Sequence, residues 1–410
     1  MRVLVVSQYF WPENFRINDV VKSLIAQDIE VEVLTGKPNY PEGIISHGYR
    51  AWGCQKEHWK GATLHRVPLF PRGRSSRLRL FINYLSFILS GLVCGSWLIR
   101  KRQYDVIFVY ALSPILLVIP ALFIGWLKGR KVIIWVQDLW PESLSATGHV
   151  HNRYIISAVR HVVRFIYRHA DLLLVQSKAF EKPVRDLVAT TPIVYYPNSV
   201  DETFAMPPTN EPPLVDGLGE GFSVMFAGNL GAAQAVGVIV EAASLLIEYV
   251  DIHFVVLGDG SSREWMLKEA QQRGLSNLHL PGRFSVEMMP SFMQKASALL
   301  VTLADQPIFS ATVPSKVQAY MAAGRPIIAC LNGEGARLVI EANAGLAAPA
   351  EDAKALADTI LHLYGLSPGE RKKMGDNGRR YYQEHFNHDC LIDQLIGHLH
   401  AMSKDGKDIH

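Results

Sequence analysis

Short apolar runs alternate with amphipathic stretches through most of the chain. In the first half, the strand-like runs RVLVVSQ, EVEVLTG, DVIFVYA, KVIIWVQD and DLLLVQS are separated by stretches with apolar residues at helical spacing, such as DVVKSLIAQ. Buried parallel strands that alternate with covering helices produce this rhythm, which is typical of βαβ units. The pattern therefore predicts an α/β fold with a parallel sheet over about residues 1–200.

A Pro-rich segment interrupts the rhythm after this first half. The segment ETFAMPPTNEPPLVDGLGEG (202–221) cannot continue a helix or a central strand, because proline fixes φ and lacks an N–H donor. The rhythm then restarts with FSVMFAG, IHFVVLG, NLHLPG, ALLVTL and PIIAC. We expect two tandem Rossmann-like, doubly wound domains, residues 1–200 and 201–385, facing a cleft at the carboxyl ends of their strands. A last helix within 386–410 is expected to pack back on the first domain.

Composition narrows the class of protein. The 410 residues are enough for two cores, and a net charge of only +3 does not suit a dedicated nucleic-acid binder. Charged residues make up 19% against 49% hydrophobic, so we expect part of the apolar surface to contact something other than water. No signal-peptide pattern opens the sequence, which predicts a cytosolic protein. Neither metal-ligand spacing nor a disulfide pattern connects the cysteines, Cys54, Cys94, Cys330 and Cys390.

The second domain offers a candidate phosphate site in a glycine turn. The strand FSVMFAG turns through Gly228, Asn229, Leu230 and Gly231 before a predicted helix. Glycines let the backbone approach a ligand, and the unpaired N–H groups at a helix start favour an anion. An isolated Gly-x-x-Gly is more often a plain tight turn, so this motif alone does not decide between the two interpretations.

A second candidate lies in VPSKVQAYMAAG. Ser315 and Gln318 fit a Ser-x-x-Gln capping box, which would be purely structural. Lys316 would oppose the macrodipole in the first helical turn, and a bound anion explains that position better than helix stability does. Arg283 follows a neighbouring strand, where a lone arginine is more often solvated. Several cations and N–H groups at adjacent strand ends would nevertheless suit a diphosphate.

The first domain places polar side chains after two of its strands. Glu13 and Arg16 follow the first strand in YFWPENFRIND, and a later strand is followed by Gln137, Asp138 and Glu142 in IIWVQDLWPES. Carboxylates and amides at these positions could orient hydroxyl groups or accept protons. The tryptophans and prolines of the same loops are better explained as a rigid, packed loop floor.

Residues 80–100, LFINYLSFILSGLVCGSWLIR, are almost wholly apolar and follow a basic segment. Their length would permit a membrane span, but the next strand begins only a few residues later. We therefore expect a helix that packs on the first domain and dips one face into the membrane interface; the alternative is a buried core helix. The side chains expected on anionic lipid head groups are those of Arg72, Arg74, Arg77 and Arg79.

Several of these segments together resemble a known family. They are MRVLVVSQYFWPE, VLTGKPNYPEG, WVQDLWPES, YPNSVD, FAGNLG, LGDG and VPSKVQAYMAAGRPII. The sequence is similar to the retaining glycosyltransferase family 4, which has the GT-B fold, over nearly its whole length. Within that family it looks most like the bacterial N-acetyl-L-fucosamine transferases that build O-antigen or capsule.

The resemblance implies that a sugar nucleotide binds to the second domain and the acceptor to the first, and that the sugar is transferred with retention and without a metal. The residues implied for the nucleotide sugar are Gly228, Asn229, Gly231, Gly258, Ser315 and Gln318. Those implied for the acceptor are Glu13, Arg16, Gln137 and Glu142. Those implied for catalysis are Asp138, Lys316 and Arg283.

The sequence also departs from the family pattern at charged positions. Two glutamates of the pattern, one of which usually holds the ribose, fall on Ala311 and Ala319. The arginine and lysine that usually bind the diphosphate are replaced by Asn229 and Gln234. In the first domain, Gln137 replaces the histidine of the pattern, and Asn14 and Phe15 replace the paired glycines of the first loop. The phosphate charge would then fall to Lys316, Arg283 and Arg16, with Gln318 the nearest candidate for the ribose.

The sequence thus predicts a peripheral glycosyltransferase at the cytoplasmic face of the inner membrane, without a cofactor. It would move a sugar, N-acetyl-L-fucosamine by resemblance, from a UDP-sugar to a polyprenyl-diphosphate-linked saccharide in the synthesis of O-antigen, a part of lipopolysaccharide, or of capsule. The partners expected are the donor, the lipid-linked acceptor and the inner leaflet, and no nucleic acid. One alternative is a sugar-nucleotide epimerase, which would not need the basic apolar helix. The other is a non-enzymatic two-lobed sugar-binding protein, a class that works outside the cytosol and would need a signal peptide.

Overall fold

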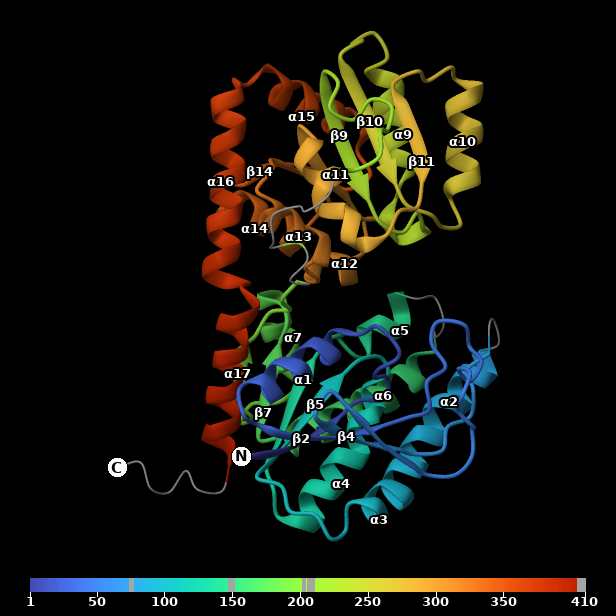
Figure 1. Ribbon diagram of the computed structural model, residues 1–410, viewed down its shortest axis with the longest axis vertical. Helices are drawn as coiled ribbons and strands as arrows, with labels where there is room; N and C mark the ends of the chain where they lie inside the picture. Colours follow the sequence, from blue (N-terminus) through green and yellow to red (C-terminus); the bar gives the residue numbers. More distant parts are fainter. Residues whose placement is uncertain (74–76, 147–151, 201–203, 205–210, 404–410) are drawn as a thin grey trace. The chain divides into compact units, whose positions relative to one another are not determined.

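The computed structural model describes residues 1–73, 77–146, 152–200, 204 and 211–403 (Figure 1). The chain divides into two compact units: unit 1 is Met1–Pro197 with Asp389–His410, and unit 2 is Asn198–His388. The Pro-rich segment 202–221 lies partly outside the described residues. Its last part belongs to unit 2, because Val215 and Leu218 pack into that unit's core.

Unit 1 is built on an eight-stranded sheet in the order β3-β4-β2-β1-β5-β6-β7-β8. Every pairing is parallel except that of β3 with β4. Its elements are β1 (Arg2–Val6), α1 (Arg16–Ala26), β2 (Glu30–Thr35), β3 (Gln55–Trp59), β4 (Ala62–Arg66), α2 (Arg77–Ser90), the π-helical turn η1 (Gly91–Gly95), α3 (Ser96–Leu98), β5 (Val106–Ala111), η2 (Ile115–Val118), α4 (Ile119–Lys128), β6 (Val132–Val136), α5 (Glu142–Ala146), α6 (Arg153–Arg168), β7 (Leu172–Val175), η3 (Lys178–Phe180), α7 (Glu181–Leu187), β8 (Ile193–Tyr195) and α17 (His388–Met402).

Alternate residues of the strands of unit 1 point to opposite faces of its sheet. One face, with Val31 and Phe108, packs against α1 and the C-terminal helix α17. Helix α17 is fixed there by its apolar residues and by the Tyr196 hydroxyl, which donates to the Leu391 carbonyl at 2.9 Å. The other face is covered by α4, whose Gly125 lies against Ile107. The same face carries the continuous helical segment α2–η1–α3.

Unit 2 is built on a six-stranded, all-parallel sheet in the order β11-β10-β9-β12-β13-β14. Buried residues fill both of its faces, so its strands read as continuous apolar runs. Its elements are β9 (Phe222–Ala227), η4 (Ala232–Gln234), α9 (Gly237–Leu245), β10 (Ile252–Leu257), α10 (Arg263–Gln272), β11 (Leu278–Gly282), η5 (Val286–Met288), α11 (Met289–Lys295), β12 (Ala298–Thr302), α12 (Pro307–Ala311), α13 (Ser315–Ala323), β13 (Ile327–Cys330), α14 (Glu334–Glu341), β14 (Gly345–Ala348), α15 (Ala353–Gly365) and α16 (Pro368–His385).

These two sheets confirm the predicted fold class, two doubly wound α/β domains in one chain. In unit 1 the strand order reverses between β1 and β5, and in unit 2 it reverses between β9 and β12. The crevice outside the carboxyl ends of the strands at such a reversal is where open α/β sheets bind ligands. The loops that follow these four strands therefore contain the candidate site residues.

Candidate functional site

In unit 2, the loops that follow β9 and β10 are joined through glycines. Gly228 and Gly258 have φ values of +142° and +150°, which L side chains rarely adopt. A Cβ on Gly258 would lie 1.8 Å from the Gly228 carbonyl oxygen, so the two loops touch through their backbones. The Leu230 N–H also donates to the Asp259 carbonyl at 2.9 Å, and the Ser262 N–H donates to the Leu230 carbonyl at 2.8 Å.

A short turn separates Gly231 from the helix predicted after it. A 3₁₀ turn, η4, follows Gly231, and α9 begins only at Gly237. The turn is tied to the end of β12, because the Thr302 hydroxyl donates to the Gln234 carbonyl. A ligand at Gly228 would meet loop N–H groups and side chains rather than the dipole of α9.

Helix α13 brings Lys316 to the carboxyl end of β9. The Tyr320 hydroxyl accepts a hydrogen bond from the Ala227 N–H at 3.1 Å, which fixes the helix against the strand. Lys316 lies one turn earlier on the same side of α13, with its Nζ 3.7 Å from the centroid of the Phe226 ring. A Cβ on Gly228 would lie 2.6 Å from the Lys316 Cε, so the lysine extends directly over that glycine.

The Lys316 amine is buried and has no hydrogen-bond partner among the residues that the structure describes. Burial lowers the pKa of this amine from 10.5 to about 7. A buried ammonium is stable only when an anion or several acceptors compensate its charge. The Phe226 ring offers a favourable face but no acceptor. An anion bound beside Lys316 would hold the amine in its charged form.

The predicted capping box is absent. Ser315 is the exposed first residue of α13; the N-cap is Pro314, and no side chain caps the helix. Gln318 is buried, and its Nε2 donates to the Asn198 carbonyl at 2.8 Å, which ties α13 to the first residues of unit 2. Its Oε1 has no partner within the described part of the chain, so a ribose contact by that atom stays a prediction.

Arg283 joins the same edge of the sheet through its neighbour. It directly follows β11, is exposed, and makes no hydrogen bond or ion pair with any described residue. The Gly258 N–H donates to the Gly282 carbonyl at 2.8 Å, which connects the loop of Arg283 to that of Gly258. Gly228, Gly258, Arg283 and Lys316 thus lie on contiguous strand ends of unit 2, and we call these four residues the strand-end cluster.

The family's missing diphosphate ligands leave polar but uncharged groups beside this cluster. Asn229 is exposed, and its Nδ2 lies 2.8 Å from where a Cβ of Gly231 would be. Gln234 carries a buried Oε1 that has no partner among the described residues. Ala319 is buried in the core of unit 2, where it presents no polar atom. Lys316 and Arg283 are therefore the free cations found at this edge of the described sheet.

In unit 1, Asp138 follows β6 and is half-buried. Its Oδ2 accepts a hydrogen bond from the Ser113 hydroxyl at 2.7 Å, and the Ser113 Oγ in turn accepts one from the Trp140 indole N–H at 3.1 Å. Sequence reasoning did not single out Ser113, and it assigned Trp140 to the loop floor. Together they hold the carboxylate of Asp138 in a fixed orientation.

Arg16 and Asp138 both affect the pKa of the Tyr110 hydroxyl. Burial raises the pKa of Tyr110 at the end of β5, while the charge of Arg16 lowers it and that of Asp138 raises it. The two predicted residues therefore lie around one strand end. Gln137 is buried beside Asp138, and its Nε2 has no partner in the described chain. Glu142 is exposed at the first position of α5.

Glu13 organises two loops of unit 1. Its Oε1 accepts hydrogen bonds from the N–H groups of Asn39 and Tyr40 at 2.7 Å each, and its Oε2 accepts one from the Phe10 N–H at 3.2 Å. Burial raises the pKa of this carboxyl group to about 7, against these backbone donors. All of its described contacts are with backbone, so the structure gives Glu13 a positioning role, and contact with an acceptor stays a prediction.

Arg72 lies beside these loops, and its expected contact with lipid stays a prediction. Its guanidinium lies 5.2 Å from the centroid of the Tyr40 ring. Its charge also lowers the pKa values of Tyr9 and Tyr84, both raised by burial, and Asp138 acts on Tyr84 as well. Sequence reasoning missed these tyrosines, because nothing in their spacing connects them.

The other three arginines of the basic segment give less information. Arg74 lies outside the described residues, and Arg77 begins α2 with a side chain that is not described. Arg79 packs its side chain against Gly73. Among the described residues, no group of three or more His, Cys, Asp or Glu side chains could hold a metal ion.

Comparison with known proteins assigns both units to related families. Residues 14–199 match a family model described as a glycosyl transferase 4-like domain, and residues 221–365 match one described as glycosyl transferases group 1. A curated relative, the putative colanic acid biosynthesis glycosyl transferase WcaI of Escherichia coli K12, is 24% identical over 341 residues. That alignment covers 79% of this chain and 82% of the relative.

Solved structures show the same fold. Sucrose-phosphate synthase from Thermosynechococcus elongatus matches with a TM-score of 0.70 at 19% identity, over 98% of this chain and all of that one. HepE of Anabaena, solved in complex with UDP, matches with a TM-score of 0.69 at 12% identity, again over 98% of this chain and 100% of that one. At these identities the likeness establishes the two-domain GT-B architecture.

Proposed function

Since this chain is a glycosyltransferase of the GT-B fold whose two halves match the 4-like and group 1 families, we propose that it transfers a sugar from a UDP-sugar to a polyprenyl-diphosphate-linked saccharide. The transfer proceeds with retention and without a metal ion. A biosynthetic role is supported by the relative WcaI, named a putative colanic acid biosynthesis glycosyl transferase, and the nucleotide by the UDP bound to HepE; the acceptor class follows from the sequence resemblance. We propose N-acetyl-L-fucosamine as the sugar, from the sequence resemblance, and O-antigen or capsule synthesis as the pathway.

The donor site is supported by one observation: the Lys316 amine is buried above Gly228 and has no partner among the described residues. A diphosphate placed there compensates the charge of this amine and favours its protonated form. Gly228 and Gly258 let the two loops pack closely, so that Lys316 extends over Gly228, and exposed Arg283 on the adjoining loop adds a second cation. Glycine loops and cations on neighbouring strand ends are what a diphosphate with several charged oxygens requires.

The chemistry follows from where charge develops. As the bond between the anomeric carbon and the diphosphate oxygen breaks, negative charge builds on the leaving diphosphate. Lys316 and Arg283 would stabilise it in the way that oxyanion-hole donors stabilise a developing oxyanion. The acceptor hydroxyl attacks from the face that the diphosphate leaves, and the departing phosphate oxygen takes the hydroxyl proton. In unit 1, Asp138, oriented by Ser113, would hold that hydroxyl rather than act as the base.

The enzyme would work as a peripheral protein at the cytoplasmic face of the inner membrane, where a lipid-linked acceptor is found. The helical segment Leu78–Leu98 is long and apolar enough to cross a membrane, with a mean hydropathy of 1.6. Only 28% of its most apolar stretch is buried. Such a segment on a glycosyltransferase also disfavours the epimerase alternative, because a nucleotide sugar is soluble and gives an epimerase no reason to reach a bilayer.

The test is donor binding followed by turnover. UDP-N-acetyl-L-fucosamine should raise the melting temperature without added magnesium, because a ligand that binds only the folded state stabilises it. UDP should then be released only when a polyprenyl-diphosphate saccharide is supplied, whereas an epimerase would convert the donor without acceptor. Lys316→Ala should lower turnover by ~10²–10³. Lys295→Ala, at an exposed lysine that ends α11, is the matched control. A shift seen only with a guanosine or cytidine sugar, or only with metal, would overturn the proposal.

A further inference from the structure

Positive charge is concentrated in one part of the sequence. Residues 71–170 contain 14 Lys and Arg but only 3 Asp and Glu, a net charge of +11. The whole chain carries only +3, so the remaining residues carry −8. This segment forms α2, α3, α4 and α6 of unit 1. The small net charge of the protein thus conceals a strongly basic group of helices.

The same helices expose large apolar side chains. Along α2–η1–α3 they recur at helical spacing, and α4 and α6 add more. The members on α2–η1–α3 are Leu78, Phe81, Leu85, Leu89, Val93 and Trp97, and those on α4 and α6 are Phe123, Trp126, Leu127 and Phe165. Trp126 is 76% exposed and Val93 71%, so these residues are not the edges of a core. We call these ten residues the docking face. An exposed apolar set of this size marks a contact surface.

The segment α2–η1–α3 is held to unit 1 along its whole length. Asn83 is fully buried; its Oδ1 accepts a hydrogen bond from the Gln8 Nε2 at 2.8 Å. Further along, Gly91 lies against the Pro120 ring of α4 and Gly95 lies against Leu34 of β2, so closely that a Cβ would clash at each. A helix fixed to unit 1 at its start, middle and end has one free side. It is therefore built to lie on a membrane rather than to cross it.

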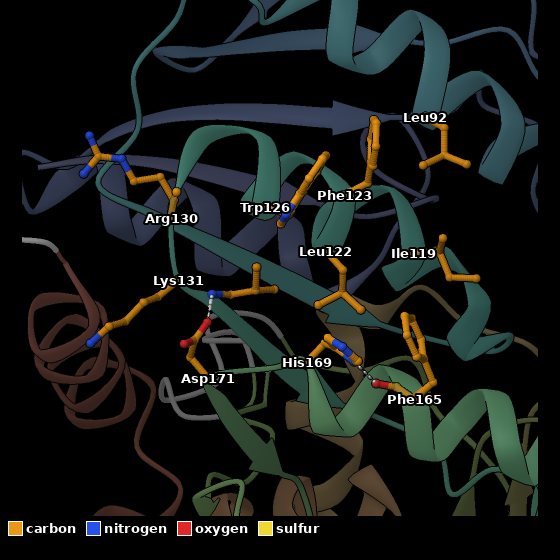
Figure 2. A pocket seen from close by; sticks show the side chains of 13 residues that line it. Leu92, Ile119, Leu122, Phe123, Trp126, Arg130, Lys131, Phe165, His169 and Asp171 are labelled. Carbon is orange, nitrogen blue, oxygen red and sulfur yellow. Dashed lines mark hydrogen bonds between the residues drawn. The ribbon is translucent and has the colours of Figure 1, made fainter.

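A groove opens between α4 and α6 next to the docking face (Figure 2). Its volume is about 680 Å³, within the range of sites that take a small ligand or one hydrocarbon chain. Its walls are mostly apolar, with Leu92, Ile119, Leu122, Phe123, Trp126 and Phe165 along it.

The charged residues of the groove are mainly basic. Arg130 and Lys131 lie at one end and extend away from the apolar side chains (Figure 2). The acid in the lining, Asp171, already accepts a hydrogen bond from the Val132 N–H at 2.8 Å, and the His169 Nδ1 is 2.8 Å from the Phe165 carbonyl. The groove therefore presents an apolar trough with free cations at its mouth, which complements an anionic head group attached to a hydrocarbon chain.

We propose that the docking face binds an anionic phospholipid bilayer, that one lipid chain enters the groove between α4 and α6, and that Arg130 and Lys131 bind the lipid phosphate. The inference rests on the proposed function, because a lipid-linked acceptor is what would bring this enzyme to a bilayer. It moves the membrane contact from Arg72 and its neighbours, as the sequence suggested, to the basic ends of α3, α4 and α6.

The pattern of charge and apolarity favours a bilayer over other partners. A nucleic-acid surface would surround its cations with polar groups, whereas here exposed aromatic and aliphatic side chains lie between them. Basic residues that border an exposed apolar helical face are the signature of an interfacial helix. On the described part of α6, Arg160, Arg164 and Arg168 are accompanied by no acidic residue, which suits an anionic leaflet.

Binding can be tested with vesicles that contain neither donor nor acceptor. The protein should sediment with vesicles of equal parts phosphatidylglycerol and phosphatidylcholine, and far less with phosphatidylcholine alone. Replacing both Arg130 and Lys131 with Gln should weaken binding roughly 25-fold, about fivefold for each charge. Phe123→Ser combined with Trp126→Ser should weaken it roughly 100-fold. Val250→Ser, at a residue 80% exposed in unit 2, is the control and should change nothing.

The groove can be tested separately by fluorescence quenching. Phosphatidylglycerol with brominated chains should quench the protein's tryptophans, and Trp126→Phe should lose part of that quenching, whereas Trp265→Phe in unit 2 should not. Equal binding to neutral vesicles, or quenching unaffected by Trp126→Phe, would overturn the inference. So would quenching that requires added polyprenyl phosphate, which assigns the groove to the acceptor, or retention that only detergent reverses, which indicates a span. The melting shift with the UDP-sugar is measured in parallel, so a failed membrane test leaves the donor site standing.

Discussion

Replacing Lys316 with methionine tests the donor site through stability alone. Methionine matches the length of the lysine stem and can remain packed over the Phe226 ring, but it has no charge to compensate. Because the Lys316 amine is buried and pairs with no residue that the structure describes, the change should make the ligand-free protein more stable. An ordinary lysine-to-methionine change at an exposed site would alter stability by less than about 0.5 kcal/mol.

The size of the effect follows from the pKa of Lys316. Burial lowers it from 10.5 to about 7. Each pKa unit corresponds to about 1.4 kcal/mol, so the buried charge costs the folded state about 4 kcal/mol at pH 7. Between pH 7 and 10.5 the unfolded chain binds a proton on this lysine that the folded chain does not, so the wild type gains stability as pH rises. The advantage of the Lys316→Met protein should therefore fall to about 2 kcal/mol at pH 9 and vanish above pH 10.5.

Denaturant unfolding at pH 6, 7 and 9 measures this difference, with and without UDP. Below pH 7 both states of the wild type are protonated, so the advantage of the variant should be largest and constant there. Saturating UDP should stabilise the wild type more than the variant, because only the wild type gains a charge pair. Lys295→Met, at an exposed lysine of the same unit, should show neither effect. A Lys316→Met protein that is less stable at pH 7, or equally shifted at pH 7 and pH 9, would show that the amine reaches water and would refute the argument.

Two further substitutions separate roles that the sequence left together. Arg72→Gln should raise the acceptor KM roughly tenfold, which corresponds to one charged hydrogen bond, and should leave vesicle binding unchanged. The reason is that Arg72 lies over the Tyr40 ring, near Asp138. A loss of vesicle binding with a normal KM would instead support a membrane role for Arg72. Gln318→Ala should lower the unfolding free energy by about 0.5–1.5 kcal/mol, because it removes the hydrogen bond from the Gln318 Nε2 to the half-buried Asn198 carbonyl, and it should spare UDP affinity. Weaker UDP binding at unchanged stability would instead support the ribose role.

The fold could be predicted because it depends on periodicity. Fully buried parallel strands such as β9 and β6 read as apolar runs whatever their neighbours are, and the alternation of runs with helices gives the doubly wound order. The sequence also predicted the edge of each sheet on which the candidate site residues would lie, since the carboxyl ends of parallel strands share one side of a sheet. Asp138, Gly228 and Gly258 lie just after the ends of their strands, as that argument predicted.

The details of the candidate sites that the sequence did not predict depend on contacts between residues far apart in the chain, and a sequence pattern does not reveal such contacts. Ser113 donates to Asp138 from another strand end, and Arg72 reaches Tyr40 from a separate loop. The capping box failed for a local reason: Pro314 takes the N-cap position, so Ser315 falls inside the helix. Gln318 was then free to bond the Asn198 carbonyl, 120 residues away in the chain.

Lys316 and Gly228 are best understood as one feature of the fold. The family pattern expects cations near positions 229 and 234, where this chain has Asn229 and Gln234. Lys316 extends over the same loop from α13, in space that a Cβ on Gly228 would occupy, and Tyr320 fixes the helix that carries it. A side chain at 228 would therefore displace the lysine, and loss of the lysine would leave the loop without a buried cation. Positive charge is thus supplied to this strand end through the packing of α13 on β9, and it is fully developed only when an anion is present to compensate it.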